Sequence, residues 1–431
     1  MLVGADVGTS GLKLVALDED GAVLAEAEEA YEPERPQPGW AQNDVGTWLS
    51  ALLRAWDRLP AGSVRALALS GQMHGAVLVD ERGAALGPAL LWPDCRALSE
   101  VQRWRDLPAA DRAALANPLV PGMTGPLLAW LAAHEPASVA AAAAVVLPKD
   151  AVRALLVPGA PATDRSDASA TLLWDVVADD WSAAAVSAAG VRRDLLPAVR
   201  PSADVVGTWR DVPVVVGGAD TPLALLASGV SGGLLVNLGT GAQVLRPGAA
   251  PVAAADPVVH RYGDVDGGWY AMAALQNGGS AWSWVRGVLG LSWPEFFAAA
   301  ESGTAGGVRF APFLTGERGG VAGPDDRGGW SGLGAGTTRA DLARAAVEGV
   351  VNAVGAAAEL LGPVDGPVVL TGGGGRVPLV RRLLADVLGR PVRWLPLRSA
   401  SAIGAAVLAG RGIGVDVVPR MEPRPDGQPL T

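Results

Sequence analysis

Asp220 has neighbours in the sequence that suggest a catalytic or binding role for its carboxylate. It follows the apolar run 212–216 and the pair Gly217-Gly218, and it precedes Thr221-Pro222. The apolar run predicts a buried strand, and ligands of α/β proteins bind beyond the carboxyl ends of such strands. Because proline suits the first turn of a helix, Asp220 or Thr221 is expected to cap a helix whose dipole helps to keep the carboxylate ionised. An ionised aspartate can accept a proton, although an isolated Asp-Thr-Pro is more often an ordinary helix cap.

A glycine-rich turn near the start of the chain could hold an anion. Glycines in the stretch 4–11 allow backbone amides to approach a phosphate closely, while Thr9 and Ser10 add hydroxyl donors. Asp6 in the same stretch could orient a hydrated metal ion. A similar turn occurs at Gly239-Thr240-Gly241, and neither is a Walker P-loop because no Gly-Lys-Ser/Thr ends it and a strand follows. A plain hairpin would explain either turn alone, but the repetition favours a phosphate cradle.

A third turn carries groups that suit the recognition of hydroxyls. Gln72, Met73 and His74 follow the predicted strand 64–69, and alternation resumes over 76–80. An amide and an imidazole at such a turn could bind hydroxyl groups. A histidine with only structural hydrogen bonds would fit the same position.

An aromatic plane lies beside charged groups a little further along. Trp92 precedes Asp94 and Arg96, a combination that suits one face of a sugar and its hydroxyls. The same residues would also suit a core tryptophan beside a surface ion pair. Cys95 has no clustered histidine, so neither a metal site nor thiol catalysis is indicated there.

The elements that must position these residues repeat in the two halves of the chain. The opening reads as strand, turn, strand, turn, strand over 2–7, 12–18 and 22–28. The same signal returns at 234–238 and 242–245. This repetition predicts two homologous lobes, with domains at 1–230 and 231–431 and a ligand cleft between them.

Strands alternate with helices in the rest of the chain, as in a sheet covered by crossover helices. Apolar residues at helical spacing predict a helix over 338–361, with Thr338 and Asp341 as a capping box. A strand at 368–370, a glycine turn and a helix at 379–388 follow. The glycine-rich, aperiodic stretch 303–336 is expected to be an active-site loop.

Composition excludes several classes of function. Half of the 431 residues are hydrophobic, but they are spread along the chain and form no span of membrane length. The formal net charge of -10 argues against a broad surface for nucleic acid or anionic lipid. The start of the chain does not resemble a signal peptide, and a single cysteine suits a reducing compartment, so a cytoplasmic protein is expected.

Taken together, the sequence motifs of this chain resemble those of the FGGY carbohydrate kinases, and among them the xylulokinases most closely, from Leu2 to about Gly410. Each string is weak alone, but their joint order is specific. The strings that carry the resemblance are 4–13, 71–75, 92–96, 147–150, 164–167, 217–220, 238–240, 316–318, 348–349 and 372–374. Two positions depart from the family pattern: Thr221 stands where Asn is common, and Gly319 stands where Thr-Pro is common.

The resemblance implies an α/β fold of two duplicated lobes of the actin and ribonuclease H type, with sugar bound mainly by the first lobe and ATP mainly by the second. It implies that Asp220 is the general base and that Asp220 and Asp6 hold Mg²⁺. The substrate-binding residues that we expect are Gln72, Met73, His74, Trp92, Asp94 and Asp220. The ATP-binding residues that we expect are Thr9, Ser10, Lys13, Gly239, Thr240, Gly372, Gly373 and Gly374.

The expected reaction is phosphoryl transfer from MgATP to a sugar hydroxyl, with D-xylulose giving D-xylulose 5-phosphate as the first choice. A kinase for another sugar, polyol or sugar acid, such as gluconate or ribulose, is the alternative within the same family. A nucleotide-gated sugar-binding protein without transfer activity is the alternative from another class. No nucleic-acid or membrane partner is expected, and a homodimer is left open.

Overall fold

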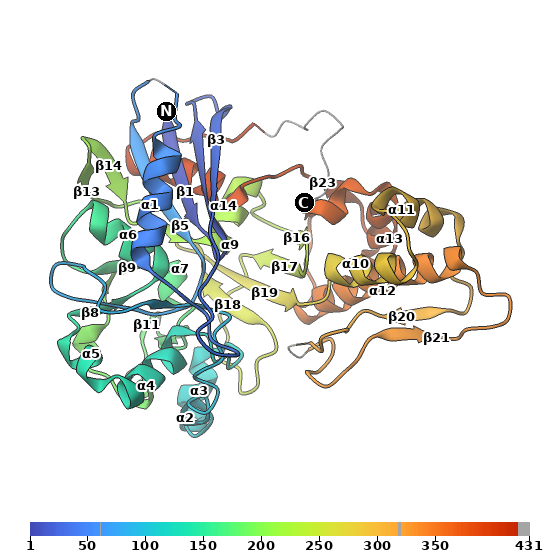
Figure 1. Cartoon of the computed structure of the whole chain (residues 1–431), viewed down its shortest axis with the longest axis horizontal. Helices are drawn as coiled ribbons and strands as arrows, with labels where there is room; N and C mark the ends of the chain where they lie inside the picture. The colour runs from blue at the N-terminus through green and yellow to red at the C-terminus, as the bar shows by residue number, and fades with distance from the viewer. Residues whose placement is uncertain (61, 318–319, 421–431) are drawn as a thin grey trace.

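Two large β-sheets, one in each half of the chain, organise the computed structural model, which describes residues 1–60, 62–317 and 320–420 (Figure 1). The seven-stranded first sheet has the order β13-β14-β5-β1-β2-β3, with β15 also paired to β5. Its strands are β1 (Leu2–Val7), β2 (Gly11–Leu17), β3 (Val23–Ala30), β5 (Ala66–Gly71), β13 (Val205–Trp209), β14 (Val212–Val215) and β15 (Gly218–Ala219). The predicted opening of strand, turn, strand, turn, strand is confirmed.

The second sheet has six strands in the order β18-β19-β17-β16-β22-β23. Its strands are β16 (Leu234–Leu238), β17 (Ala242–Pro247), β18 (His260–Gly263), β19 (Trp269–Leu275), β22 (Val368–Thr371) and β23 (Val392–Trp394). In both sheets an antiparallel meander (β1-β2-β3 and β16-β17-β19) is followed by parallel strands, since β5 runs parallel to β1 and β22 runs parallel to β16. The prediction of a duplicated α/β fold is confirmed.

Alternation along the central strands explains why each sheet is covered on both faces. In β1, Val3, Ala5 and Val7 point into one core cluster and Leu2 points into another. The first of these clusters is shared with α1 (Val45–Trp56) and α6 (Pro148–Leu156). Successive side chains of a strand face opposite sides of the sheet, so a strand that is apolar throughout is buried between two layers.

The other face of the first sheet is covered by α9 (Asp220–Ser228) and α14 (Ala400–Gly412). The helix α14 comes from the end of the chain but lies beside β1 and α9, in the part of the molecule formed by the N-terminal half (Figure 1). Close contact requires glycine here: a Cβ on Gly4 would come within 2.0 Å of the carbonyl oxygen of Ala402. The last described helix thus ties the two halves together.

Helices of the C-terminal half cover one face of the second sheet and enclose a core with Trp282, Phe296 and Val350. They are α10 (Gly279–Val288), α11 (Trp293–Ser302), α12 (Arg339–Leu360) and α13 (Pro378–Leu388), with the 3₁₀ turn η2 (Gly373–Arg376) before α13. The capping box of Thr338 and Asp341 begins α12 as predicted. The stretch 303–336 is not wholly irregular, because it contains the hairpin of β20 (Arg309–Ala311) and β21 (Gly329–Ser331).

The remaining elements belong to the first half of the chain and lie outside its large sheet. The two-stranded pairs are β4 (Gln42–Asn43) with β7 (Ala89–Leu90), β6 (Val77–Val79) with β8 (Ala144–Val146), β9 (Ala162–Asp164) with β12 (Ala198–Arg200), and β10 (Trp174–Asp175) with β11 (Asp180–Trp181). The helices are α2 (Gln102–Arg105), α3 (Ala109–Leu115), α4 (Thr124–His134), α5 (Pro136–Ala141), α7 (Arg165–Ala168), α8 (Ala183–Ala189) and the 3₁₀ helix η1 (Arg193–Leu195). Their core continues into the second sheet through Tyr262, Tyr270 and Met272. Within the described residues, no helix combines the length and the apolar character that crossing a bilayer demands.

Candidate active site

Asp220 is the first residue of α9, directly after the short strand β15. The position before the helix is taken by Ala219, so the expectation that Asp220 or Thr221 caps the helix is wrong by one residue. The Oδ1 atom of Asp220 accepts hydrogen bonds from the backbone amide of Thr221 (2.6 Å) and from its hydroxyl (3.2 Å). The carboxylate of Asp220 therefore lies at the N-terminus of α9 but is not its N-cap.

The electrostatic surroundings of Asp220 also differ from the expectation. Burial, and after it the negative charge of Asp6, raise its pKa to about 7, against the opposing effect of the hydrogen bonds from Thr221. We expected the helix dipole to keep this carboxylate readily ionised, but desolvation outweighs it because a buried charge loses its hydration. A carboxylate with a pKa near neutrality suits proton abstraction at physiological pH.

Asp6 lies on β1 beside the end of β5. Its Oδ1 atom accepts a hydrogen bond of 2.9 Å from the hydroxyl of Ser70. Burial raises the pKa of Asp6, against the effects of Ser70 and of the positive charge of Lys13. Lys13 is directly opposite Asp6 on β2, is half exposed, and lies 3.9 Å from Glu28. The structure thus brings Asp6, Lys13 and Asp220 into one electrostatic neighbourhood.

The turn that links β1 to β2 is bonded to the turn that follows β5. The hydroxyl of Thr9 donates to Gln72 Oε1 (3.1 Å) and accepts from the indole N–H of Trp92 (2.8 Å). Gln72 also donates to the carbonyl oxygen of Gly8 (3.3 Å). Ser10 is exposed at the tip of the first turn. Predicted phosphate and sugar residues are therefore adjacent, with Thr9 as the link.

The turn with Met73 and His74 has an unusual backbone. His74 has a φ of 66° and Gly75 a φ of 77°, so two successive residues adopt the left-handed region. Nδ1 of His74 lies 2.6 Å from the carbonyl oxygen of Ala170, and Sδ of Met73 lies 3.8 Å from the hydroxyl of Tyr270. Non-glycine residues in this region are uncommon and concentrate at binding sites.

The structure does not present Asp94 for direct contact with a ligand. Its carboxylate is fully buried, accepts from the backbone amide of Ala41 (2.7 Å) and forms an ion pair of 2.9 Å with Arg96. Arg96 in turn lies over the ring of Trp40, 3.8 Å from its centroid. Asp94 orders the segment that carries Trp92, which is the bonded neighbour of Thr9.

The glycine turns of the second half are brought together by the sheet. Because β16 and β22 are parallel and in register, Gly239-Thr240 and Gly372 leave the sheet at the same edge. Gly372 has a φ of 81°, and a Cβ there would come within 2.5 Å of the carbonyl oxygen of Leu238. A Cβ on Gly374 would lie 2.7 Å from the Leu238 side chain. The amides of Gly278 and Ser280 donate to the carbonyl oxygen of Thr240, which anchors this turn to the start of α10.

The string 316–318 is described only in part. Glu317 is buried and accepts hydrogen bonds from the backbone amide of Gln276 at 2.9 and 3.0 Å. Its side chain therefore supports the segment between β19 and α10. Arg318 and Gly319, which we singled out in the sequence, lie outside the described residues.

Two carboxylates that interact electrostatically, Asp6 and Asp220, suit the predicted magnesium ion. The charge of Asp6 raises the pKa of Asp220, so a divalent cation beside both would relieve their repulsion. Mg²⁺ is commonly held by one or two carboxylates together with phosphate oxygens and water. The described residues contain no cluster of three or more His, Cys, Asp or Glu side chains that would hold a metal by itself. The residues present thus fit an ion that arrives with a nucleotide.

Sequence reasoning missed three side chains of this neighbourhood. The hydroxyl of Tyr31 donates to the carbonyl oxygen of Gly8 (2.7 Å), Ser70 bonds Asp6, and Tyr270 contacts Met73. The charge of Asp220 is one cause of the raised pKa of Tyr270, which places a residue of the second half near the carboxylate. Ser70 ends a predicted strand and could have been found from that signal, whereas Tyr31 and Tyr270 are remote in sequence.

A hollow of about 900 Å³ lies elsewhere, between the β10–β11 hairpin, β12 and the turn from β18 to β19. It is lined by Trp174, Trp181 and Asp264 among others, and by none of the predicted site residues. Two of its arginines pair with aspartates that also line it, Arg165 with Asp179 at 2.9 Å and Arg193 with Asp180 at 3.9 Å. The residues that we predicted to bind substrates or to catalyse the reaction therefore lie outside this hollow.

Residues 1–227 match the N-terminal domain of the FGGY family of carbohydrate kinases, and residues 234–413 match its C-terminal domain. The chain belongs to this family. Membership makes it an ATP-dependent carbohydrate kinase. The chain is 34% identical to the xylulose kinase of Klebsiella pneumoniae and 33% identical to that of Escherichia coli (strain K12), covering 95% of this chain and 89% of each relative.

Solved structures of the FGGY kinase family share the whole architecture. A xyloylose kinase from Brucella ovis superposes with a TM-score of 0.90 at 28% identity, over 98% of this chain and 93% of that one. A xylulose kinase from Rhodospirillum rubrum gives a TM-score of 0.88 at 26% identity, over 96% and 90% of the two chains. The duplicated fold of this kinase is thus the family's fold.

Proposed function

We propose that this kinase transfers the terminal phosphoryl group of ATP to a hydroxyl of D-xylulose, giving D-xylulose 5-phosphate and ADP. The observation that carries the proposal is the pair Asp6, near the end of β1, and Asp220, directly after β15, in a chain whose relatives are named xylulose kinases. One carboxylate can serve as the base and both can face the phosphates.

Asp220 is the base in this mechanism. The sugar hydroxyl oxygen attacks the terminal phosphorus, the bond from that phosphorus to the bridging oxygen breaks, and the hydroxyl proton passes to the Asp220 carboxylate. A pKa of about 7 makes the carboxylate a better proton acceptor than an ordinary aspartate, and the hydrogen bonds from Thr221 orient it.

The first turn and Lys13 would receive the phosphates. Lys13 adds positive charge next to Asp6, and the amides and hydroxyls of 8–11 add donors. Asp6 and Asp220 would hold Mg²⁺, which when bound neutralises phosphate charge. In the second half, Gly239, Thr240 and 372–374 would accommodate the nucleotide, because glycine lets a ligand approach the backbone closely.

The sugar would bind on the first half. Met73, His74 and Gln72 form the turn next to Thr9, and Trp92 supplies an aromatic group bonded to Thr9. We assign residues 1–230 to the sugar-binding domain and 231–431 to the ATP-binding domain. Tyr270 of β19 contacts Met73, and the ring of Tyr262 of β18 lies 6.0 Å from that of His74, so the second half would also contribute to the sugar pocket.

A panel of sugars tests the substrate assignment. ATP consumption is measured with D-xylulose, D-ribulose, gluconate and glycerol at equal concentrations, and the phosphorylated product is identified by mass and by its position of phosphorylation. We expect kcat/KM to be highest for D-xylulose. A higher kcat/KM for gluconate or ribulose would replace the substrate, and no transfer to any acceptor would favour a binding protein.

Where the protein works and how it assembles are further parts of the proposal. ATP and a reduced Cys95, which is exposed, both suit the cytoplasm. A homodimer is the assembly that we propose. Light scattering coupled to gel filtration would give twice the chain mass of 43.7 kDa for a dimer.

A further inference from the structure

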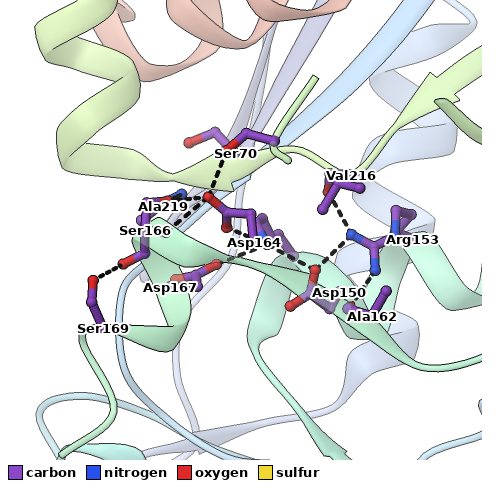
Figure 2. A network of polar contacts seen from close by, with 12 residues as sticks. Ser70, Asp150, Arg153, Ala162, Asp164, Ser166, Asp167, Ser169, Val216 and Ala219 are labelled. Atoms are coloured by element: carbon purple, nitrogen blue, oxygen red, sulfur yellow. Dashed lines mark hydrogen bonds and ion pairs between the residues drawn. The ribbon is translucent and has the colours of Figure 1, made fainter. Parts of the chain in front are cut away.

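A group of buried charged residues lies behind the strand that leads to Asp220. We call it the Lys149 cluster, and its members are Lys149, Asp150, Arg153, Asp164, Ser166 and Asp167. Nζ of Lys149 is 2.8 Å from Asp150, 3.2 Å from Asp164 and 2.9 Å from Asp167, and its side chain is fully buried. Figure 2 shows Asp164 in the middle of this network, between Ser166 on one side and Asp150 with Arg153 on the other.

The charges of the cluster are almost balanced. Lys149 and Arg153 oppose three carboxylates, and burial followed by the neighbouring carboxylates raises the pKa of Asp167 to about 8, against the effect of Lys149. Burial lowers the pKa of Lys149, but its three carboxylate partners outweigh that effect and raise it. Buried ion pairs add little net stability compared with an apolar core. Stability alone therefore does not explain a cluster of five buried charges, and a role in positioning its neighbours is the alternative.

The cluster is hydrogen-bonded to both ends of the segment 216–219, which directly precedes Asp220. At one end, the amide of Ala219 donates to the hydroxyl of Ser166 (2.9 Å), and that hydroxyl donates to Asp164 (2.5 Å). At the other end, the guanidinium of Arg153 donates to the carbonyl oxygen of Val216 and to Asp150. Both anchors appear in Figure 2, with Ala219 and Val216 on opposite sides of Asp164.

The segment 216–219 has little conformational preference of its own, because its two central residues are glycines. Gly217 has a φ of 88°, and a Cβ there would come within 2.2 Å of the carbonyl oxygen of Leu69. A Cβ on Gly218 would likewise come within 2.5 Å of Cγ1 of Val265. Two consecutive glycines lose more conformational freedom on ordering than other residues. External hydrogen bonds must therefore fix the direction in which the chain enters α9.

The neighbouring strand β5 carries Ser70, the hydrogen-bond partner of Asp6. Gly218 pairs with Ser70 and Ala219 pairs with Gly71, while the hydroxyl of Ser70 bonds Asp6. A Cβ on Gly71 would lie 2.9 Å from Cβ of Lys149, so the cluster also packs directly on this strand. The relative placement of Asp6 and Asp220 thus depends on the strands that the cluster supports.

We propose that the Lys149 cluster is a positioning device for Asp220, acting through Ser166 and Arg153 on the two ends of the segment 216–219. The proposal deepens the proposed function, on which its kinetic part rests. Ser166 and Arg153 are positioning residues, because they act on the reacting carboxylate only through the backbone that they hold.

The main test compares Ser166→Ala with a matched serine variant. Ser166→Ala removes the acceptor of the Ala219 amide. Ser169→Ala removes a serine hydroxyl of similar burial, three residues on, that accepts from the amide of Gly263 (2.8 Å). We expect Ser166→Ala to lower kcat about 10- to 100-fold with little change in KM for ATP or sugar, because small displacements of a reacting group have effects of that size. Ser169→Ala should keep kcat within about twofold.

A second measurement does not depend on turnover. Hydrogen exchange of a peptide that covers 216–221 should be faster in Ser166→Ala than in the wild type and unchanged in Ser169→Ala. If the wild type phosphorylates no sugar, the proposed function fails and the exchange result still decides whether the clamp exists. Wild-type kcat, or unchanged exchange, in Ser166→Ala would overturn the positioning proposal.

Arg153→Lys provides a further variant if Ser166→Ala unfolds. It keeps the positive charge beside Asp150 but cannot reach Val216 and Ala162 at once with a planar fork. We expect a lower kcat, an unchanged KM and faster exchange at 216–221. An Arg153→Lys enzyme that is folded and has wild-type kcat would contradict the role of this end of the clamp.

Discussion

At the scale of single residues, the mechanism that we propose depends on how Asp6 and Asp220 influence each other. Both are partly buried, burial raises the pKa of each, and the charge of Asp6 adds to the shift at Asp220. The base that we propose, Asp220, works only if it is unprotonated when the sugar arrives, and only if its carboxylate points at the hydroxyl. Its removal and its titration therefore make separate predictions.

Asp220→Asn should lower kcat by about 10²- to 10⁴-fold, because the amide cannot accept the hydroxyl proton. ATP affinity should stay within about twofold, since the nucleotide is assigned to the second half. Steady-state kinetics and calorimetric ATP titration provide the two numbers. Near-native turnover in Asp220→Asn would remove this residue as the base.

The rate should also depend on pH in a defined direction. Because the pKa of Asp220 is raised to about 7, the fraction of the free enzyme with an ionised base falls as pH falls through 7. We expect kcat/KM to drop about tenfold per pH unit below that value and to level off above it. A cation bound with ATP lowers the pKa, so the corresponding fall in kcat should occur at a lower pH. A kcat/KM that is flat from pH 5 to 8 would contradict the shift.

At the scale of elements, α9 is held in place by α14. A Cβ on Gly404 of α14 would come within 1.9 Å of the carbonyl oxygen of Leu223 in α9, so the two helices touch along their backbones. The helix that begins with Asp220 therefore depends on a helix from the far end of the chain. Contacts this close leave no room for even a methyl group.

Gly404→Ala should lower the free energy of unfolding by about 1–3 kcal/mol, because overpacking forces α9 and α14 apart. It should also lower kcat, since Asp220 moves with α9. Gly287→Ala in α10 is the matched control: a Cβ there meets nothing within 4 Å. Alanine in a helix is favoured over glycine by up to about 1 kcal/mol, so the control should be neutral or stabilising. Equal stability of the two variants in chemical denaturation would argue against tight packing at Gly404.

At the scale of the whole molecule, duplication places equivalent turns at the ends of equivalent strands. The turn after β1 and the turn after β16 occupy the same position, between the first two strands of the antiparallel meander in each sheet. One half carries both carboxylates, and the glycines assigned to ATP come from the other half. A complex of both substrates is therefore expected to draw the halves together and to exclude water from the reaction.

Closure should be visible by small-angle X-ray scattering. We expect a smaller radius of gyration with ATP, Mg²⁺ and D-xylulose together than with either substrate alone, measured on Asp220→Asn so that the complex persists. Free protein and the xylulose-saturated protein without nucleotide serve as references. Superimposable profiles for all samples would rule out a large closure.

Much of the fold and some of the site could be read from the sequence because the signals are local. Alternation and turn residues located β1, β2 and β16, and helical spacing with a capping box located α12, since these features depend on neighbours in the chain. The strand and glycines before Asp220, and the glycine-threonine turns, were likewise visible. The exact start of α9 was misjudged, because residue preferences at a cap do not determine a boundary to one residue, and the hairpin of β20 and β21 within 303–336 was not predicted.

Tertiary structure alone decided what the charged groups do. The sequence could not show that Asp94 is buried, paired with Arg96 and hydrogen-bonded to the amide of Ala41. Nor could it show that burial and Asp6 raise the pKa of Asp220. Both results depend on groups distant in the chain. The same holds for Ser166, whose hydroxyl meets the amide of Ala219 across 53 positions. Hydration and Coulomb energies depend on distance in space, so they became defined only when the chain folded.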